Sequence, residues 1–391
     1  MISSQGVKDL KPRERFLRAI HFEEVDRVPH AVQFWPETVD KWYREGHLKS
    51  NFGVKDYKPY GALPIGALDY DVMCEIYGLD MLPPWNSNSP FFRLDFSPMF
   101  PQEVLEKGET WVIVRDEWGI KKKVRRDGES VPQFLEFPVK TAEDFKSIKA
   151  RFDPEDPRRF PEDWEWKVKK ALEEETAPIG WGFPGFFGFA RWLMGTQRLL
   201  IALIREPNFI RKIFDFWADF ILSLAKKALE IQVDYLGIWE DLAYRNGPMI
   251  SPQIFRSLFV PYYKKVTSAF QKKGVDVTLV DSDGDINSLI PFWLEGGVNG
   301  FLPLEVQAGM DAVSLREKYG DKIVLMGNIS LWALRLGPKA IDEEISKKFP
   351  SLLPGGGYIA STDHHIPPDV PYENFMHYLK RVQKWGRYSV K

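Results

Sequence analysis

From residue 160 onward, the chain alternates between short apolar runs and longer amphipathic stretches, with no long linker between them. The apolar runs are largely continuous rather than alternating, which is typical of strands covered on both faces, as in a parallel sheet. Strand and helix patterns that alternate in this way predict an α/β fold built on a parallel sheet. The runs that we expect to form strands are 177–183, 233–242, 275–284, 298–305, 322–330 and 357–365.

Two further runs nearer the N-terminus, at 27–34 and 67–73, bring the number of expected strands to eight. Because eight parallel strands are enough to close a barrel, we predict a (β/α)8 TIM barrel that occupies residues 1–391 as a single domain. The segment of about 75–165 departs from the alternation, since it contains runs typical of antiparallel strands and a charged, proline-rich stretch. We interpret this segment as a β-containing insertion over one rim of the barrel.

Charge and cysteine content narrow the class of protein. The 53 basic and 55 acidic residues are interspersed and give a net charge of −2, which argues against nucleic acid or an anionic membrane as the partner. The single cysteine, Cys74, excludes a disulfide framework and indicates a reducing compartment. The first residues form no signal-peptide pattern, and no uncharged apolar run approaches the ~18 residues of a membrane span. We therefore expect a soluble, cytoplasmic protein.

The ends of the expected strands carry many ionisable and aromatic side chains. In a barrel of parallel strands, functional residues lie at the C-terminal ends of the strands. A single aspartate after a strand is more often a helix cap or turn residue, and Asp285 fits that description. The other strand-end residues are Trp181, Phe183, Trp239, Glu240, Asp241, Asp281, Asp283, Glu305, Asn328, Asp363, His364 and His365. We predict that six of these converge on one cavity, namely Trp181, Asp241, Asp281, Asp283, Asn328 and His364.

The stretch "VDSDGD" at 280–285 raises the sharpest chemical question. Asp281 and Asp283 are two residues apart, so in an extended chain both side chains project to the same side. Two ionised carboxylates ~4 Å apart repel by roughly 4 kcal/mol at an effective dielectric constant near 20. A metal ion, a shared proton, a basic neighbour or water must offset that repulsion. Gly284 lets the chain turn sharply, and we predict that both aspartates form an acidic centre coupled to His364.

Four segments resemble the uroporphyrinogen decarboxylase superfamily. They are "KPRERFLRAIHFEEVDRVP" (11–29), "EDLAYRNGPMISPQIFRSLFVPYYKKV" (240–266), "LVDSDGDINSLIPFWLEGGVNGFLPLE" (279–305) and "STDHHIPPDVPYENF" (361–375). The superfamily contains decarboxylases of the tetrapyrrole pathway and methyltransferases that move methyl groups to or from corrinoid proteins. The resemblance implies a (β/α)8 barrel with its site at the C-terminal ends of the strands.

The sequence departs from both branches of that superfamily. Porphyrinogen decarboxylases carry paired arginines just after the first strand, whereas residues 30–43 here contain no arginine. The zinc methyltransferases carry His-x-Cys after the fifth strand and a further Cys near the last, where this chain has Asp281-x-Asp283 and "TDHH". Asp281, Asp283 and His364 would suit zinc or another divalent ion as oxygen and nitrogen ligands. The metal-free alternative uses the same groups for hydrogen bonding and proton transfer.

The resemblance and the strand ends together predict a methyltransferase that demethylates a small O- or N-methylated substrate and passes the methyl group to a corrinoid protein. The expected catalytic residues are Asp241, Asp283 and His364. The expected substrate-binding residues are Trp181, Phe183, Trp239, Glu240 and Asn328. Two alternatives stay open: a decarboxylase or lyase of a small carboxylate with Asp283 and His364 as acid and base, and a non-catalytic binding barrel. The resemblance also suggests a homodimer.

Overall fold

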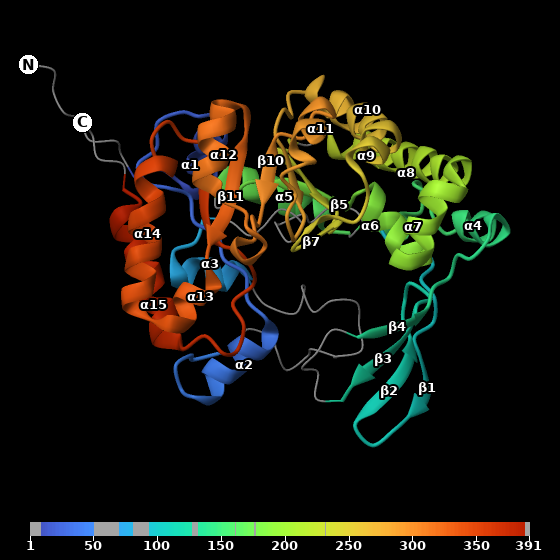
Figure 1. The fold of residues 1–391 in the computed structure, drawn as a ribbon, viewed down its shortest axis with the longest axis horizontal. Coiled ribbons are helices and arrows are strands. Elements are labelled where there is room, and N and C mark those ends of the chain that lie inside the picture. Colours follow the sequence, from blue (N-terminus) through green and yellow to red (C-terminus); the bar gives the residue numbers. More distant parts are fainter. Residues whose placement is uncertain are drawn as a thin grey trace, which may run out of the picture.

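The computed structural model describes residues 9–50, 70–80, 94–126, 132–160, 162–175, 177–230 and 232–387. Its centre is a parallel sheet of six strands, in the order β12-β11-β10-β9-β6-β5 (Figure 1). These strands are β5 (Gly180–Pro184), β6 (Tyr235–Trp239), β9 (Thr278–Asp281), β10 (Gly300–Leu302), β11 (Val324–Ile329) and β12 (Tyr358–Thr362). Each overlaps one of the six apolar runs expected to form strands after residue 160, and only β5 extends beyond its run, by one residue, so those predictions are confirmed.

The N-terminal run 27–34 extends this sheet beyond β12. His30 forms a parallel bridge with Ala360, and Phe34 forms another with Ile366. On the other side of this run, the backbone N–H of Asp80 donates to the carbonyl of His30 at 2.8 Å. The chain after residue 77 therefore lies beside the N-terminal run, as the next strand of a closed barrel would.

The prediction of a strand at 67–73 is wrong for the residues of this run that the structure describes. Residues Tyr70–Tyr77 form the helix α3, and residues 67–69 lie outside the described part of the chain. Met73 and Tyr77, four residues apart, are buried, whereas Ile76 is exposed. This spacing matches one face of a helix and explains why the segment does not adopt a strand.

Helices follow the strands and cover the outer face of the sheet (Figure 1). Ser251 caps α9 (Pro252–Leu258) by accepting a hydrogen bond from the N–H of Ile254 at 3.2 Å, as is typical of serine before a helix. The helices between and after the parallel strands are α6 (Phe186–Met194), α7 (Thr196–Arg205), α8 (Pro207–Ala228), α9 (Pro252–Leu258), α10 (Val260–Gln271), α11 (Ile290–Glu295), α12 (Ala312–Tyr319), α13 (Leu331–Leu336), α14 (Pro338–Leu352) and α15 (Tyr372–Trp385). Earlier in the chain lie α1 (Pro12–Ile20), α2 (Pro36–Arg44), α4 (Ala142–Lys149) and α5 (Trp164–Glu174). Within the described ranges, no helix combines the length and apolarity needed to cross a bilayer.

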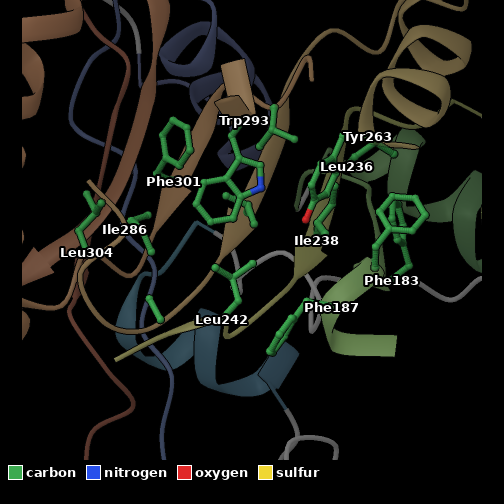
Figure 2. Close-up of a cluster of buried hydrophobic side chains, with 14 of the residues drawn as sticks. Phe183, Phe187, Leu236, Ile238, Leu242, Tyr263, Ile286, Trp293, Phe301 and Leu304 are labelled. Atoms are coloured by element: carbon green, nitrogen blue, oxygen red, sulfur yellow. The ribbon is translucent and has the colours of Figure 1, made fainter. Parts of the chain in front are cut away.

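The larger hydrophobic core fills the space between the sheet and the helices. Figure 2 shows part of it, where Trp293 of α11 lies among side chains of neighbouring strands. The Trp293 ring is 6.0 Å from that of Phe301 on β10 and 5.1 Å from that of Phe255 on α9. Buried aromatic rings of this size contribute much of the apolar area that stabilises such a layer.

A second apolar cluster fills the inside of the barrel near the N-terminal ends of the strands. It includes Tyr235, Leu279 and Met326 from three strands together with Phe16 of α1. The rings of Phe16 and Tyr235 lie 5.1 Å apart. Because α1 and this cluster occupy the N-terminal end of the barrel, polar chemistry is left to the C-terminal end.

Antiparallel strands form a sheet in the segment before β5, so the β content expected of this segment is confirmed. They are β1 (Glu103–Lys107), β2 (Trp111–Arg115), β3 (Lys121–Arg125) and β4 (Gln133–Glu136), paired in that order. Figure 1 shows this sheet, in teal, projecting away from the barrel below α6 and α7. Trp118, in the β2–β3 turn, and Phe134 of β4 both contact Trp192 of α6, with ring centres 6.1 Å apart in each case. The single-domain interpretation and the limits of 75–165 for the insertion stay predictions.

Candidate active site

Three strand ends that are separated in sequence meet at the C-terminal end of the sheet. Asp241 follows β6, Asp283 follows β9, and His364 follows β12. The backbone N–H of Asp283 donates to Oδ1 of Asp241 at 3.3 Å, and Nε2 of His364 lies 3.4 Å from Oδ1 of Asp283. Since β9 and β12 are separated by two strands in the sheet, its curvature brings these side chains together. We call Asp241, Asp281, Asp283 and His364 the acidic centre.

The turn after β9 depends on Gly284. This residue has a φ of +84°, and a Cβ atom placed on it would lie 2.7 Å from the carbonyl oxygen of Ala243. Any other residue would meet both a disfavoured backbone conformation and a backbone clash. The N–H of Gly284 donates to Oε2 of Glu305 at 2.8 Å, which ties this turn to the end of β10. The tight turn directs Asp283 toward the neighbouring strand ends.

Burial and mutual repulsion act on the carboxylates of the acidic centre. Burial, together with the charges of Asp283 and Asp241, raises the pKa of Asp281 well above its ordinary value. Burial and the charge of Asp283 raise the pKa of Asp241 to about 6, against the opposing effect of Arg191. The repulsion expected from "VDSDGD" is therefore present, and together with burial it favours the protonated form of Asp281.

The pKa of His364 is also raised, but for an imidazole this shift favours the charged form. Burial by itself lowers the pKa of its imidazole, but the hydrogen bond and charge of Asp283 outweigh that effect. The charges of Asp363 and Glu305 act in the same direction, and the pKa of His364 rises to about 9. At neutral pH the acidic centre therefore contains an imidazolium beside Asp283.

Arg191 of α6 is a second cation at the acidic centre, and it was not among the residues expected there. Its Nη1 donates to the backbone carbonyl of Asp241 at 2.9 Å, and its Nη2 lies 3.4 Å from Oδ2 of the same residue. The guanidinium also lies 4.7 Å from the ring centre of Trp239, whose ring is tilted against that of Trp192 at 5.7 Å. Of the expected substrate-binding residues, Trp239 is thus the one that this arginine connects to the acidic centre.

Glu240 was expected to bind substrate, but its carboxylate is fully buried and engaged by the start of α6. It accepts hydrogen bonds from the backbone N–H groups of Phe186 at 2.8 Å and Gly188 at 2.9 Å, and from the hydroxyl of Tyr263. A Cβ atom on Gly185 would lie 2.0 Å from Oε1 of Glu240, so the glycine makes room for this carboxylate. Burial raises the pKa of Glu240 to about 7. Glu240 therefore positions α6, and its expected role in substrate binding stays a prediction.

The side chain of Asn328 likewise forms hydrogen bonds with backbone groups. Its side chain is completely buried and donates to the carbonyls of Leu304 at 2.7 Å and Met310 at 2.9 Å. Its amide oxygen accepts from the N–H of Ala312 at 3.1 Å. These bonds hold the connection between β10 and α12, so the structure does not bring Asn328 into the acidic centre as expected.

Trp181 and Phe183 also lie away from the acidic centre. Both side chains are buried, and their rings are 5.8 Å apart. The Trp181 ring packs 5.2 Å from that of Phe270 on α10, and Phe183 belongs to the layer shown in Figure 2. Alternate residues of a strand share one face, and here that face is turned toward the helices. The expected pocket walls are thus part of the packing between sheet and helices.

A pocket of about 240 Å³ adjoins His364. We call it the rim pocket, and its lining residues are Trp35, Gln307, Leu331, Trp332, Arg335, Asp363, His364, His365 and Pro367. His365 lies with its ring 5.5 Å from that of Trp35, and burial lowers the pKa of His365 to about 4, so this imidazole is neutral. The rim pocket therefore offers indole and imidazole surfaces next to the acidic centre.

Asp363 organises the walls of the rim pocket. Its Oδ1 accepts from the N–H of Leu331 at 3.0 Å, at the start of α13. Its Oδ2 accepts from the N–H of Val306 at 3.2 Å, at the start of the short 3-10 helix η4 (Val306–Ala308). The side chain is 2% exposed. Asp363 therefore ties two separate segments to the end of β12, a role that its place at a strand end did not reveal.

The expected metal ligands do not fit a metal ion in this arrangement. Among the described residues, no three or more His, Cys, Asp or Glu side chains form a group that could hold one. Asp281 is 7% exposed within β9, whereas the side chains of Asp283 and His364 are 45% and 37% exposed. The three side chains therefore lie at different depths, and we assign no chemical step to a metal at these residues.

Comparison with known proteins supports the same fold. The methyltransferase from Methanosarcina mazei superposes with a TM-score of 0.62 at 18% identity, covering 96% of this chain and 99% of that one. At that identity the likeness concerns the fold, and it confirms the (β/α)8 barrel that the six parallel strands indicate.

Sequence comparison finds relatives that are named uroporphyrinogen decarboxylase. The uroporphyrinogen decarboxylase of Aliarcobacter butzleri is 25% identical over 228 residues, which are 56% of this chain and 62% of that protein. The uroporphyrinogen decarboxylase of Alkalilimnicola ehrlichii is 22% identical over 386 residues, covering 92% of this chain and 91% of that protein. The sequence model of the family described as uroporphyrinogen decarboxylase (URO-D) matches residues 112–385. Since this match covers most of the sequence, the chain belongs to the uroporphyrinogen decarboxylase family.

Proposed function

We propose that this protein is a methyltransferase that removes a methyl group from a small O- or N-methylated substrate and passes it to a corrinoid protein. The observation that carries the proposal is the meeting of Asp241, Asp283 and His364 at the C-terminal end of the barrel, beside the rim pocket. The fold shared with a methyltransferase from Methanosarcina mazei is compatible with this reaction class.

The reaction needs a proton at a defined place. When the bond between the methyl carbon and the substrate oxygen or nitrogen breaks, the electron pair of that bond stays on the oxygen or nitrogen. That atom leaves more readily if it takes up a proton as the methyl group departs. The corrinoid of the partner protein supplies the nucleophile that accepts the methyl group. The residues of this chain must bind the substrate, orient it and deliver the proton.

His364 is the proposed proton donor. Its Nε2 faces Asp283 at 3.4 Å, which leaves Nδ1 of the imidazolium as the donor to the leaving atom. Asp283 stabilises the charged ring, in the way that a carboxylate orients a catalytic histidine elsewhere. Asp241 accepts the N–H of Asp283 and so fixes the backbone from which that carboxylate projects. Arg191 offsets part of the negative charge at Asp241.

The proposal predicts a large effect from a small change at Asp283. Asp283→Asn keeps the shape of the side chain but removes the charge that stabilises the His364 imidazolium, so turnover should fall by at least ~100-fold. The assay would measure methyl transfer to reduced cobalamin, as a stand-in for the partner protein, from a panel of small methoxy and methylamino compounds.

Asp285→Asn is the matched control for this assay. Asp285 lies two residues away in the same turn, and its Oδ1 accepts from the N–H and the side-chain amide of Asn287 at 3.0 and 2.8 Å. We expect this variant to keep turnover near that of the wild type. If Asp283→Asn and Asp285→Asn are both folded and Asp283→Asn turns over as fast as the wild type, the proposed role of the acidic centre is contradicted.

Decarboxylation of a small carboxylate is the second candidate function. It is favoured by the names of the curated relatives and by the guanidinium of Arg335 in the rim pocket, which is suited to a carboxylate. Asp283→Asn would impair either reaction, so the product distinguishes them. Methylated cobalamin identifies the first reaction, and carbon dioxide released from a substrate without a methyl group identifies the second.

A further inference from the structure

The rim pocket contains a guanidinium whose hydrogen-bonding capacity is largely unused. Nε of Arg335 lies 2.8 Å from Oδ2 of Asp369, but without the geometry of a hydrogen bond. Within the described ranges, no residue accepts a hydrogen bond from its two terminal nitrogens. The Asp369 side chain is 61% exposed, and ion pairs of that kind contribute little. Arg335 can therefore receive an anion without losing a strong internal partner.

The guanidinium of Arg335 lies over an aromatic ring in the rim pocket. This guanidinium lies 4.9 Å from the ring centre of Trp332, which is three residues earlier in α13. Trp332 is 49% exposed, which is unusual for so large an apolar side chain. Trp35 contributes a second indole to the same pocket. Such surfaces favour a ligand with a flat ring, because stacked or tilted aromatic pairs gain stability beyond simple burial.

The volume of the pocket limits the size of the ligand. A water molecule in the liquid occupies about 30 Å³, so a pocket of about 240 Å³ has room for about eight groups of that size. This is enough for one six-membered ring with a small anionic substituent. It lies below the range of about 300–1,000 Å³ that is usual for drug-sized ligands.

We propose that the rim pocket binds a small carboxylate with a flat ring, its carboxylate on Arg335 and its ring against Trp35 and Trp332. His364 lies in the same pocket and also contacts Asp283, so the opposite end of the ligand reaches the acidic centre. This inference deepens the proposed function and rests on it for the reaction at that end. The substrate class is then a methoxylated or N-methylated ring carboxylate.

Isothermal titration with four probes tests the ligand class directly. The probes are 4-methoxybenzoate, benzoate, anisole and choline. Both carboxylates should bind the wild type at least about tenfold more tightly than anisole, because a charged hydrogen-bonding pair is lost with the carboxylate. Choline, which carries a positive charge, should bind more weakly than either carboxylate. Equal affinity for anisole and 4-methoxybenzoate, or tighter binding of choline, would overturn the proposal.

Two arginine variants assign the effect to the pocket. Arg335→Gln should weaken binding of 4-methoxybenzoate about tenfold or more while leaving anisole unchanged. Arg381→Gln is the matched control, since Arg381 also lies over an indole, 5.1 Å from the ring centre of Trp385, and pairs with Asp342 at 2.6 Å outside the rim pocket. It should leave binding of all four probes unchanged. Unchanged affinity of Arg335→Gln for 4-methoxybenzoate would overturn the assignment.

Measurements of ligand binding and of turnover together distinguish a failure of the pocket assignment from a failure of the methyl-transfer proposal. If 4-methoxybenzoate binds through Arg335 but no methyl group reaches reduced cobalamin, the pocket assignment stands and the methyl-transfer proposal fails. If methyl transfer occurs from neutral methoxy compounds while the carboxylates fail to bind, the methyl-transfer proposal stands and the pocket assignment fails. The ligand series on the wild type gives an answer even if Arg335→Gln does not fold.

Discussion

Asp283 contacts Asp241 and His364, the other two proposed catalytic residues, through different groups. Its backbone N–H bonds to Asp241, and its carboxylate faces His364. The backbone contact would survive a change of side chain, whereas the contact to His364 would not. This separation makes Asp283→Asn a specific test of the charge, because the turn itself is fixed by Gly284 and Glu305.

The raised pKa of His364 predicts a pH-dependent contribution to stability. Its pKa is about 9 in the folded protein and 6.5 in an unperturbed histidine, so the folded state binds the proton more tightly. This contribution is fully present below pH 6.5 and is lost as the pH rises through 9. We therefore expect His364→Gln to lower the free energy of unfolding more at pH 6 than at pH 10. Urea unfolding of both proteins at the two pH values measures the difference, and a larger effect at pH 10 would contradict the assigned shift.

At the scale of elements, buried carboxylates join segments of the fold at the C-terminal end of the barrel. Glu240 holds the start of α6, and Asp363 holds the starts of α13 and η4. In both cases a carboxylate accepts from backbone N–H groups that open a helix, where negative charge is favoured. The helices that carry Arg191 and Arg335 are therefore positioned from the strand ends themselves.

Asp363→Ala should loosen both segments without unfolding the barrel. Hydrogen bonds to a charged group contribute about 1.5–3 kcal/mol each, so losing them should speed amide exchange at Leu331 and Val306 about tenfold or more. Hydrogen exchange measured by NMR or mass spectrometry reports this change. Asp311→Ala removes a comparable acceptor for the N–H of Val313 at 2.9 Å, and its effect should remain within α12. Unaltered exchange at Leu331 in Asp363→Ala would show that Asp363 does not hold α13.

At the scale of the whole molecule, the strand pattern after residue 160 was predictable because continuous apolar runs distinguish buried parallel strands from amphipathic helices. The segment 67–73 was mistaken for a strand since only Met73 and Tyr77 show the helical spacing, over barely two turns. The convergence of Asp241, Asp283 and His364 followed from the rule that strand ends of one sheet meet.

Other site residues could not be found by that rule. Arg191, Trp332 and Arg335 lie on helices that follow strands, and the face that such a helix presents depends on how it packs. Trp181 and Phe183 lie at a strand end, but the sequence does not show whether they face the barrel interior or the helices. The predicted positions of these side chains were wrong because packing in three dimensions decides which way a side chain points. The position of the residue along the chain does not reveal it.

We also predict that the molecule does not bind a large porphyrin with several carboxylates. No arginine lies between Val28 and Tyr43 to hold several carboxylates, and the rim pocket of about 240 Å³ suits a small ligand. Titration with uroporphyrin at physiological salt should therefore show no micromolar binding. Micromolar affinity would contradict the small-substrate account and favour porphyrinogen decarboxylation.

The most direct test of the acidic centre is an NMR titration of His364 in the wild type, Asp283→Asn and Asp285→Asn. His364→Gln assigns the resonance, and six histidines make the spectrum tractable. We predict a pKa of about 9 for His364 in the wild type and in Asp285→Asn. In Asp283→Asn, the pKa should fall toward its ordinary value of 6.5, because burial is then opposed only by the charges of Asp363 and Glu305. A wild-type pKa near 6.5 that does not respond to Asp283→Asn would contradict the coupling on which the account depends.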